Sequence, residues 1–141
     1  MALGELIGEW KGKLASVKVC PFDSSGQGVK YEFTWLGEVS GRLSGRELGT
    51  DYWLVAPDGT GMFTYYGVLT TPEGEVVLEE GRGTSIPMGQ GRTRARATVT
   101  FKTTAPKLAW LNNLIGAFES EGDFSGNLSA KVFSGKYYEW L

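Results

Sequence analysis

The stretch that decides the fold is GTDYWLVAPDGTGMFTYYGVLTTPEGEVVLEEGRG, residues 49–83. It contains two turns of one pattern, Ala-Pro-Asp-Gly-Thr at 56–60 and Thr-Pro-Glu-Gly-Glu at 71–75. Proline presets the first central position of a type I turn, and glycine accepts the left-handed conformation that follows. Both turns therefore predict three-residue hairpin loops that join three antiparallel strands.

These turns also predict the register of the three strands. Counting back from each loop, Asp51 lies opposite Tyr65, and Trp53 lies opposite Phe63, all on one face of the sheet. A slip of one residue would exchange the two faces. The other face is expected to carry Tyr52, Leu54, Met62, Thr64, Tyr66, Val68, Leu78, Glu80 and Arg82.

Neither face of this meander is plainly polar, whereas a sheet wetted on one side alternates more cleanly. Two apolar faces predict a closed barrel with a lined interior and a covered outer surface. The rest of the chain is rich in short alternating runs, has 21 glycines and lacks a long crossover. We therefore predict one all-β domain over residues 1–141, a single antiparallel up-and-down β-barrel with one short helix. Strands are expected at 8–19, 28–41, 41–48, 50–55, 61–70, 75–83, 91–103 and 125–133, where 28–41 and 41–48 are either two strands or one long bent strand. The helix is expected near 105–118, and residues 81–91 are expected to form a flexible loop between strands that could lie over the barrel mouth.

Composition excludes several classes of function. The chain has a formal net charge of -2 and no histidine, so nucleic-acid binding and imidazole-based catalysis or metal binding are not expected. Cys20 is the only cysteine, and no apolar run is long enough to cross a membrane. We expect a cytoplasmic protein with no cofactor, no metal, no nucleic-acid partner and no membrane partner.

Three segments of the chain together resemble a known family. TDYWLVAPDGT (50–60), YYGVLTTPEGEVVLEEGRG (65–83) and FKTTAPKLAWLNNLIGAFESEG (101–122) are similar to the domain-of-unknown-function 3237 family. The matching features are a strand start at Asp51, the turn at 54–59, Arg82-Gly83, and Pro106 followed by Trp110-Leu111-Asn112. The resemblance implies a small barrel like that of allene oxide cyclase, and the family has no agreed activity.

The chain departs from the family where members carry charged residues after the Pro-Asp-Gly turn. Here Met62, Thr64 and Tyr66 occupy that strand. This difference favours an apolar, polyketide-like or lipid-like ligand over a sugar or an anion. We expect a small-molecule-binding barrel, and, if it transforms its ligand, a cofactor-free isomerase or cyclase that works by holding a reactive conformation. The alternatives are a non-catalytic carrier or sensor, and a structural homodimer whose core is filled.

The expected catalytic residues are Tyr66, Glu80 and Arg82, which share a face. A phenol, a carboxylate and a guanidinium in a cavity could polarise a carbonyl and move a proton. The Arg82-Gly83 match to the family favours this face inward, with Asp51 at the barrel rim and Trp53 outside. The alternatives are a cross-strand ion pair of Glu80 with Arg82, and the opposite orientation, in which Asp51 is the cavity carboxylate.

The expected ligand-binding wall is aromatic. Tyr31, Phe33 and Trp35 alternate along one strand and would form a continuous surface. Core packing is the usual explanation of such a stripe, and a ligand cavity is the alternative. A homodimer is expected to cover the outer face of the barrel. The complete set of expected ligand-binding residues is Tyr31, Phe33, Trp35, Asp51, Trp53, Met62, Thr64, Tyr65, Trp110 and Asn112.

Two charged groups are interpreted as surface features. Arg92, Arg94 and Arg96 share one face of a cleanly alternating strand, and we expect that face to meet water. The acidic run at 119–123 could bind a hard cation, but it lacks the spacing of a calcium loop and is interpreted as a solvated loop.

Overall fold

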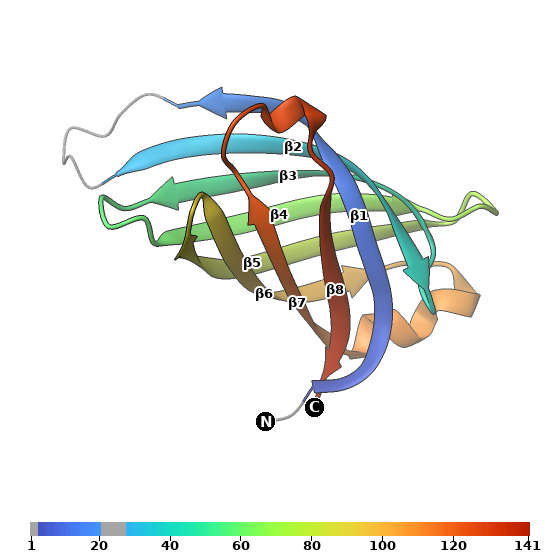
Figure 1. Ribbon diagram of the computed structural model, residues 1–141. Helices are drawn as coiled ribbons and strands as arrows, with labels where there is room; N and C mark the ends of the chain where they lie inside the picture. Colours follow the sequence, from blue (N-terminus) through green and yellow to red (C-terminus); the bar gives the residue numbers. More distant parts are fainter. Residues whose placement is uncertain (1–2, 21–27) are drawn as a thin grey trace.

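The computed structural model describes residues 3–20 and 28–141. It is a closed barrel in which each strand is antiparallel to the next and β8 returns to pair with β1 (Figure 1). The predicted up-and-down barrel is confirmed. Its strands are β1 (Leu3–Val19), β2 (Val29–Gly41), β3 (Gly45–Val55), β4 (Gly61–Thr70), β5 (Val76–Gly89), β6 (Arg92–Lys102), β7 (Ile115–Asp123) and β8 (Phe133–Trp140).

The two Pro-acid-Gly turns form as predicted. Gly59 donates its N–H to the carbonyl of Ala56 at 2.9 Å, and Gly74 donates to Thr71 at 2.9 Å. Both glycines have positive φ, +90° and +84°, which other residues adopt only with strain. The predicted register of β3, β4 and β5 is confirmed with them, and it pairs Asp51 with Tyr65, Trp53 with Phe63 and Gly67 with Glu79.

The predicted strand boundaries are wrong in several places. Residues 41–48 and 50–55 are not two strands, because β3 runs unbroken from Gly45 to Val55. The expected mouth loop at 81–91 is largely strand, since β5 continues to Gly89. Both errors treated glycine and small polar residues as breaks, although a strand tolerates them where a neighbouring strand pairs on each side.

The C-terminal part of the sheet also differs from the prediction. The acidic run at 119–123 lies within β7, and the expected strand at 125–133 instead contains the short 3₁₀ helix η2 (Leu128–Ala130). β8 follows it. The alternation of apolar and polar residues did not predict β7. Ser120 and Gly122 point into the barrel, so the inner face of this strand carries small residues and lacks the large apolar ones that indicate a buried face.

One end of the barrel is closed by the 3₁₀ helix η1 (Pro106–Asn113), which confirms the predicted short helix although it ends before 118. It lies across the barrel end in Figure 1. Leu111 is fully buried there with Leu43, Leu69 and Val77. Because η1 and these buried residues fill this end, the interior site lies in the middle of the barrel and toward its other end. In the part of the chain that the structure describes, no helix is both long and apolar enough to cross a membrane.

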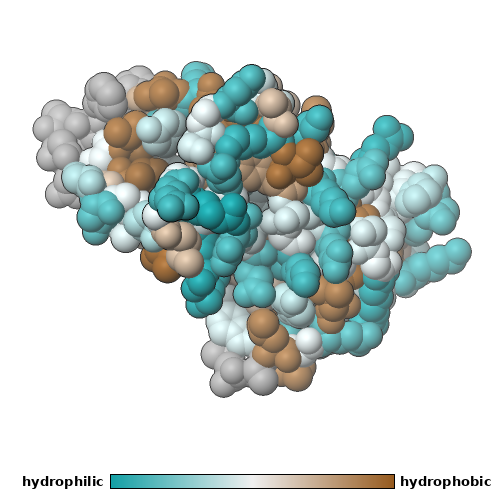
Figure 2. All heavy atoms as spheres, in the orientation of Figure 1, coloured by the Kyte–Doolittle hydropathy of each residue, from teal (hydrophilic) through white to brown (hydrophobic). Residues whose placement is uncertain are grey.

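An apolar row crosses the outer face of four neighbouring strands. Leu36, Leu48, Val68 and Leu78 are successive cross-strand partners on β2 to β5, and each is between 41% and 55% exposed. The side of the barrel that faces the viewer in Figure 2 is instead mainly hydrophilic or intermediate, and β1, β7 and β8 form it. The expected homodimer therefore stays a prediction, and this row is the surface that it would cover.

We expect two copies to associate through this row about a two-fold axis. Glu38 and Arg46 are cross-strand partners beside the row, so they offer complementary charges to a second copy. Replacing Val68 with Glu would bury an uncompensated carboxylate and should weaken dimerisation about 30-fold, or about 2 kcal/mol. Sedimentation equilibrium measures this constant, with Val132→Glu as the control because Val132 is exposed outside the row. The prediction is wrong if the wild-type protein is still monomeric at 100-fold the concentration used for this sedimentation measurement.

Candidate functional site

A cavity of about 70 Å³ lies inside the barrel. It is about half the size of an engineered cavity that holds benzene, at about 150 Å³, and far below the 300–1,000 Å³ of drug-sized pockets. The cavity therefore fits a group of only a few heavy atoms. Its walls are largely aromatic and include the rings of Trp10, Trp35, Trp53, Phe63, Phe118 and Phe133.

Asp51 is the central polar residue of this cavity. It lies on β3, points inward and is 8% exposed. Its Oδ2 accepts the indole N–H of Trp35 at 2.9 Å and that of Trp53 at 3.1 Å. Among the described residues its Oδ1 has no hydrogen-bond partner. One carboxyl oxygen is thus held in place, and the other is free to contact a ligand.

The environment keeps Asp51 close to half-protonated near neutral pH. Burial raises the pKa of its carboxyl from 3.8 to about 7, and the nearby Glu47 also raises it. The two indole hydrogen bonds favour the ionised form and lower the pKa, but burial outweighs them. A carboxyl with a pKa of about 7 can both accept and release a proton near pH 7.

A second acidic group lies beside Asp51, toward the η1 end of β3. Tyr65 donates its hydroxyl to Glu47 Oε1 at 2.5 Å, and Tyr137 donates to the same oxygen at 3.4 Å. Burial first, and then the adjacent Glu47 carboxyl, hold the pKa of Glu79 well above its ordinary value. Neither Glu79 oxygen has a donor beside it among the described residues, so a protonated Glu79 that donates to Glu47 satisfies the pair.

Glycines make room for the ring that reaches this acidic group. Gly49 and Gly67 are cross-strand partners, and the Tyr65 ring lies flat over both. A Cβ at Gly49 would be 2.2 Å from the Tyr65 hydroxyl oxygen, and one at Gly67 would be 2.3 Å from it. Tyr65 can therefore reach Glu47 only because its strand neighbours lack side chains.

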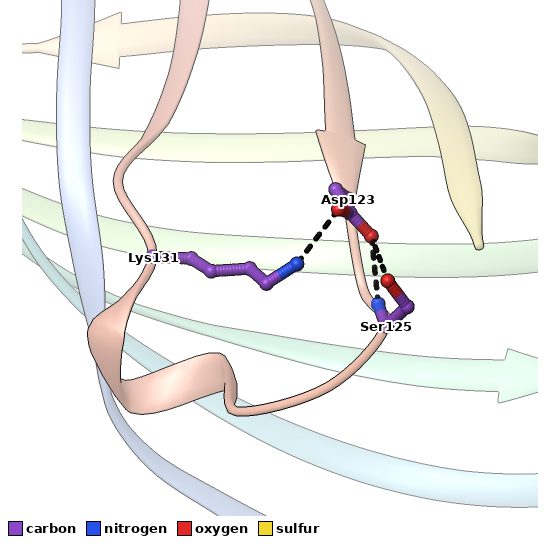
Figure 3. A network of polar contacts seen from close by, with 3 residues as sticks. All are labelled: Asp123, Ser125 and Lys131. Carbon is purple, nitrogen blue, oxygen red and sulfur yellow. Dashed lines mark hydrogen bonds and ion pairs between the residues drawn. The ribbon is translucent and has the colours of Figure 1, made fainter. Parts of the chain in front are cut away.

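The end of the barrel away from η1 is covered by the connection between β7 and β8. Phe124 lines the cavity and packs against Phe133, with ring centroids 4.9 Å apart. Asp123 holds the two ends of the connection together, since it pairs with Lys131 Nζ at 2.7 Å and accepts the Ser125 N–H at 2.9 Å (Figure 3). Phe124 therefore forms part of the cavity wall at this end.

The alternative role of the acidic run at 119–123 as a cation site finds no support. Asp123 is engaged by Lys131, and Glu121 pairs with Arg94 at 3.4 Å and with Arg92 at 3.7 Å on the barrel exterior. Over residues 3–20 and 28–141, no group of three or more acidic, cysteine or histidine side chains is placed to hold a metal ion.

The predicted orientation of the three expected catalytic residues is wrong. Tyr66, Glu80 and Arg82 lie on the outer face, as do the expected ligand-binding residues Met62 and Thr64. Tyr66 is 50% exposed and Met62 is 65% exposed. The Arg82-Gly83 match to the family therefore favoured the wrong face. Apolar content did not correct it, because the outer face carries large apolar residues while the inner face alternates glycines with large rings.

The predictions for Asp51 and Trp53 are corrected by the same inversion. Asp51 is not at the rim and Trp53 is not outside the barrel, because both line the interior cavity with Phe63 and Tyr65. The structure therefore realises the orientation that was held as the alternative. The prediction that these four residues share one face is confirmed.

The expected aromatic wall on β2 is present, and only part of it touches the cavity. Trp35 lines the cavity, whereas Phe33 packs between Trp53 and Phe124, and Tyr31 stacks on Phe33 with centroids 5.5 Å apart. These rings are mainly core.

The two expected ligand-binding residues of η1 do not line the cavity. Asn112 instead hydrogen-bonds both the N–H and the carbonyl of Thr103 at 2.9 Å, which fastens η1 to the end of β6. Trp110 lies under the Arg42 guanidinium, 3.8 Å from its ring centroid. Both residues therefore make structural contacts at the end of the barrel that η1 closes.

Sequence reasoning did not single out Glu47, Glu79, Trp10 or Tyr137, which also form the interior. A signal for two of them was present. Glu47 is four residues before Asp51, so the two share a strand face, and the predicted register placed Glu79 on that face as well. Tyr137 carried no such signal because β8 was not predicted.

Solved structures share this fold at low sequence identity. A protein of unknown function from Clostridium acetobutylicum ATCC 824 matches with a TM-score of 0.81 and 20% identity, over 100% of both chains. A β-barrel-like protein from Acinetobacter baumannii AYE matches at 0.80 and 18%, over 98% of this chain and 94% of its own. An enzyme from Penicillium herquei matches at 0.65 and 18%, over 99% and 96%. These similarities show a common β-barrel fold.

No family model and no curated protein sequence matches the chain. The resemblance to the domain-of-unknown-function 3237 family therefore stays a prediction, while the barrel that it implies is observed. The cytoplasmic location also stays a prediction.

Proposed function

We propose that the protein binds a small molecule inside its barrel and that Asp51 exchanges a proton with it. One observation carries this proposal. The Asp51 carboxyl is oriented by two indole N–H groups on Oδ2 and presents Oδ1 to an apolar cavity without a partner among the described residues. An oriented carboxyl with a raised pKa in a cavity is a common arrangement for acid–base chemistry.

The chemistry that this arrangement supports is cofactor-free isomerisation or cyclisation. In the simplest case Asp51 Oδ1 removes a proton from one carbon of the ligand, a double bond shifts, and the same carboxylic acid returns the proton to another atom. Protons and electrons balance without an oxidant or a reductant. The barrel interior excludes water from this exchange. An enzyme from Penicillium herquei has the same architecture, which is compatible with catalysis in this barrel.

The cavity volume limits the size of the ligand. A polyketide-like or lipid-like molecule does not fit within about 70 Å³. We therefore propose a ligand whose reacting part is a few heavy atoms, with any longer part reaching toward Phe124. A non-catalytic carrier would bind the same ligand without proton exchange.

The proposal is tested with a library of fragments of up to about six heavy atoms. Binding should shift the indole N–H resonances of Trp35 and Trp53 in heteronuclear NMR spectra, because these groups touch Asp51. For a bound fragment with an acidic C–H, deuterium uptake from heavy water should rise with pH through an inflection near 7. Asp51→Asn should slow that uptake by about 10²–10⁴-fold, the usual contribution of a general base.

The matched control is Glu80→Gln, a carboxyl removed from the outer face of the same barrel. The rate of deuterium uptake by a fragment should be the same with this variant as with the wild type. Binding with no deuterium uptake would identify a carrier, and binding that depends on Glu80 or Arg82 instead of Asp51 would overturn the proposed site.

A further inference from the structure

The barrel interior holds acidic groups without basic ones. Asp51, Glu47 and Glu79 are 8%, 5% and 3% exposed, and among the described residues no lysine or arginine is buried. The residues that line the cavity likewise include no basic side chain. A buried charge is costly unless it is paired, so these carboxyl groups need protons or a cation from outside the chain.

Several oxygens of these carboxyl groups lack hydrogen-bond partners in the described residues. Oε2 of Glu47 and both carboxyl oxygens of Glu79 are inaccessible, and a protonated Glu79 that donates to Glu47 satisfies that pair. Asp51 Oδ1 then remains as the acceptor without a partner among the described residues that line the cavity. Native proteins satisfy most buried polar atoms. The buried indole N–H of Trp10 also lacks a partner, but it lies against Gly37 on the barrel wall. The open position beside Asp51 is an acceptor, so the partner missing there is a donor.

The walls around Asp51 suit a positive charge. Trp10, Trp35, Trp53 and Phe118 line the cavity, and Trp35 and Trp53 direct their N–H edges to Asp51 Oδ2, which leaves Oδ1 among the rings. The tyrosine hydroxyls of the interior donate to Glu47. Aromatic rings attract cations through their negative faces, and tryptophan does so best. Aromatic walls around a carboxylate are the combination that recognises an organic ammonium group.

We propose that the ligand of this barrel carries a small protonated amine, which donates to Asp51 Oδ1 inside the aromatic cavity. The inference rests on the proposed function, because it takes the interior as the ligand site, and it adds the charge and class of the ligand. A primary ammonium group of one or two carbons suits a cavity of about 70 Å³. A metal ion suits it less, since apart from the carboxyl groups the walls offer rings and not oxygen ligands.

Ammonium binding and protonation of Asp51 exclude each other. The titratable groups beside Asp51 are Glu47 on its own strand and Tyr65 on β4, and behind them lie Glu79 on β5 and Tyr137 on β8, next to Glu47. None of them supplies a positive charge. Burial raises the pKa of Asp51 to about 7, so the cation displaces a proton whenever it binds below that pH. Affinity should therefore rise as the pH increases from 5 to 8.

The experiment compares ethylammonium chloride with ethanol, a neutral molecule of the same heavy-atom count. Both are titrated into the wild type at pH 8 in constant sodium chloride, and the indole N–H resonances of Trp35 and Trp53 report binding. Ethylammonium should bind at least about 10-fold more tightly than ethanol. Its affinity at pH 5 should be about 100-fold lower than at pH 8, as a carboxyl with a pKa of about 7 requires.

Asp51→Asn should remove the preference for the cation and bring the two affinities together, while Glu80→Gln on the outer face should leave it unchanged. Calorimetry at pH 6 in two buffers of different ionisation enthalpy should show a released proton in the wild type and none in Asp51→Asn. Ethanol binding as tightly as ethylammonium would overturn this inference and leave the proposed site standing. Indole resonances that respond to neither compound, nor to any fragment of the library, would overturn both.

Discussion

Between pH 5 and pH 8 the protein should lose stability as the pH rises. Burial raises the pKa of Asp51 to about 7 in the folded state, whereas an unfolded aspartate has a value near 3.8. Between these two values the folded chain holds a proton that the unfolded chain has released. The stabilisation is complete below pH 4 and is lost as the pH passes through 7.

A difference of about three pKa units corresponds to about 4 kcal/mol for Asp51 alone. Glu79 acts in the same direction, because burial and the adjacent Glu47 raise its pKa. The exposed pair of Asp123 with Lys131 acts in the opposite direction, since this contact lowers the pKa of Asp123, but its effect is confined to pH values below 4. Urea denaturation at pH 5, 6, 7 and 8 measures the slope of the unfolding free energy against pH.

Asp51→Asn should flatten this slope, because an amide accepts both indole hydrogen bonds without ionising. At pH 8 the variant should be about 2–4 kcal/mol more stable than the wild type, and at pH 5 the two should be similar. Glu80→Gln, on the outer face, is the control and should leave the slope unchanged. A wild-type stability that rises from pH 5 to pH 8 would show that Asp51 titrates as an ordinary carboxyl.

Gly49→Ala should destabilise the barrel by about 3 kcal/mol or more, the upper range for overpacking combined with a lost hydrogen bond. The new Cβ would lie 2.2 Å from the Tyr65 hydroxyl oxygen, so the ring must leave its place over Gly49. Its hydrogen bond to Glu47 Oε1 breaks, and that oxygen keeps the longer bond from Tyr137 at 3.4 Å. Thermal and urea unfolding measure the loss.

Gly81→Ala is the matched control, since Gly81 is the partner of Tyr65 on β5 and also lines the cavity. A Cβ there would have its closest contact at 3.3 Å, so the cost should be much smaller. In a Tyr65→Ala background the cost of Gly49→Ala should nearly vanish, because the ring that clashes is gone. If Gly49→Ala destabilises the protein equally with and without the Tyr65 ring, glycine is needed at position 49 for the backbone and not to make room for the ring.

Much of the local architecture was determined by the sequence alone. Pro-acid-Gly turns act over four or five residues, so they set the register of β3, β4 and β5 and group Asp51 with Trp53, Phe63 and Tyr65 without any tertiary contact. Pro106 marked η1 for the same reason, since a proline at the start of a helix is a local preference.

The tertiary structure alone decided which face of the sheet lines the barrel. Period-two alternation assigns residues to two faces but does not say which is inside, and here both faces carry large side chains. Closure of the barrel chose the face on which glycines leave room for rings such as Tyr65, and it left Tyr66, Glu80 and Arg82 outside. It also joined Glu47 and Glu79, which are 32 residues apart in the sequence. The pKa of Asp51 is decided at the same level, because burial arises only when all eight strands enclose it.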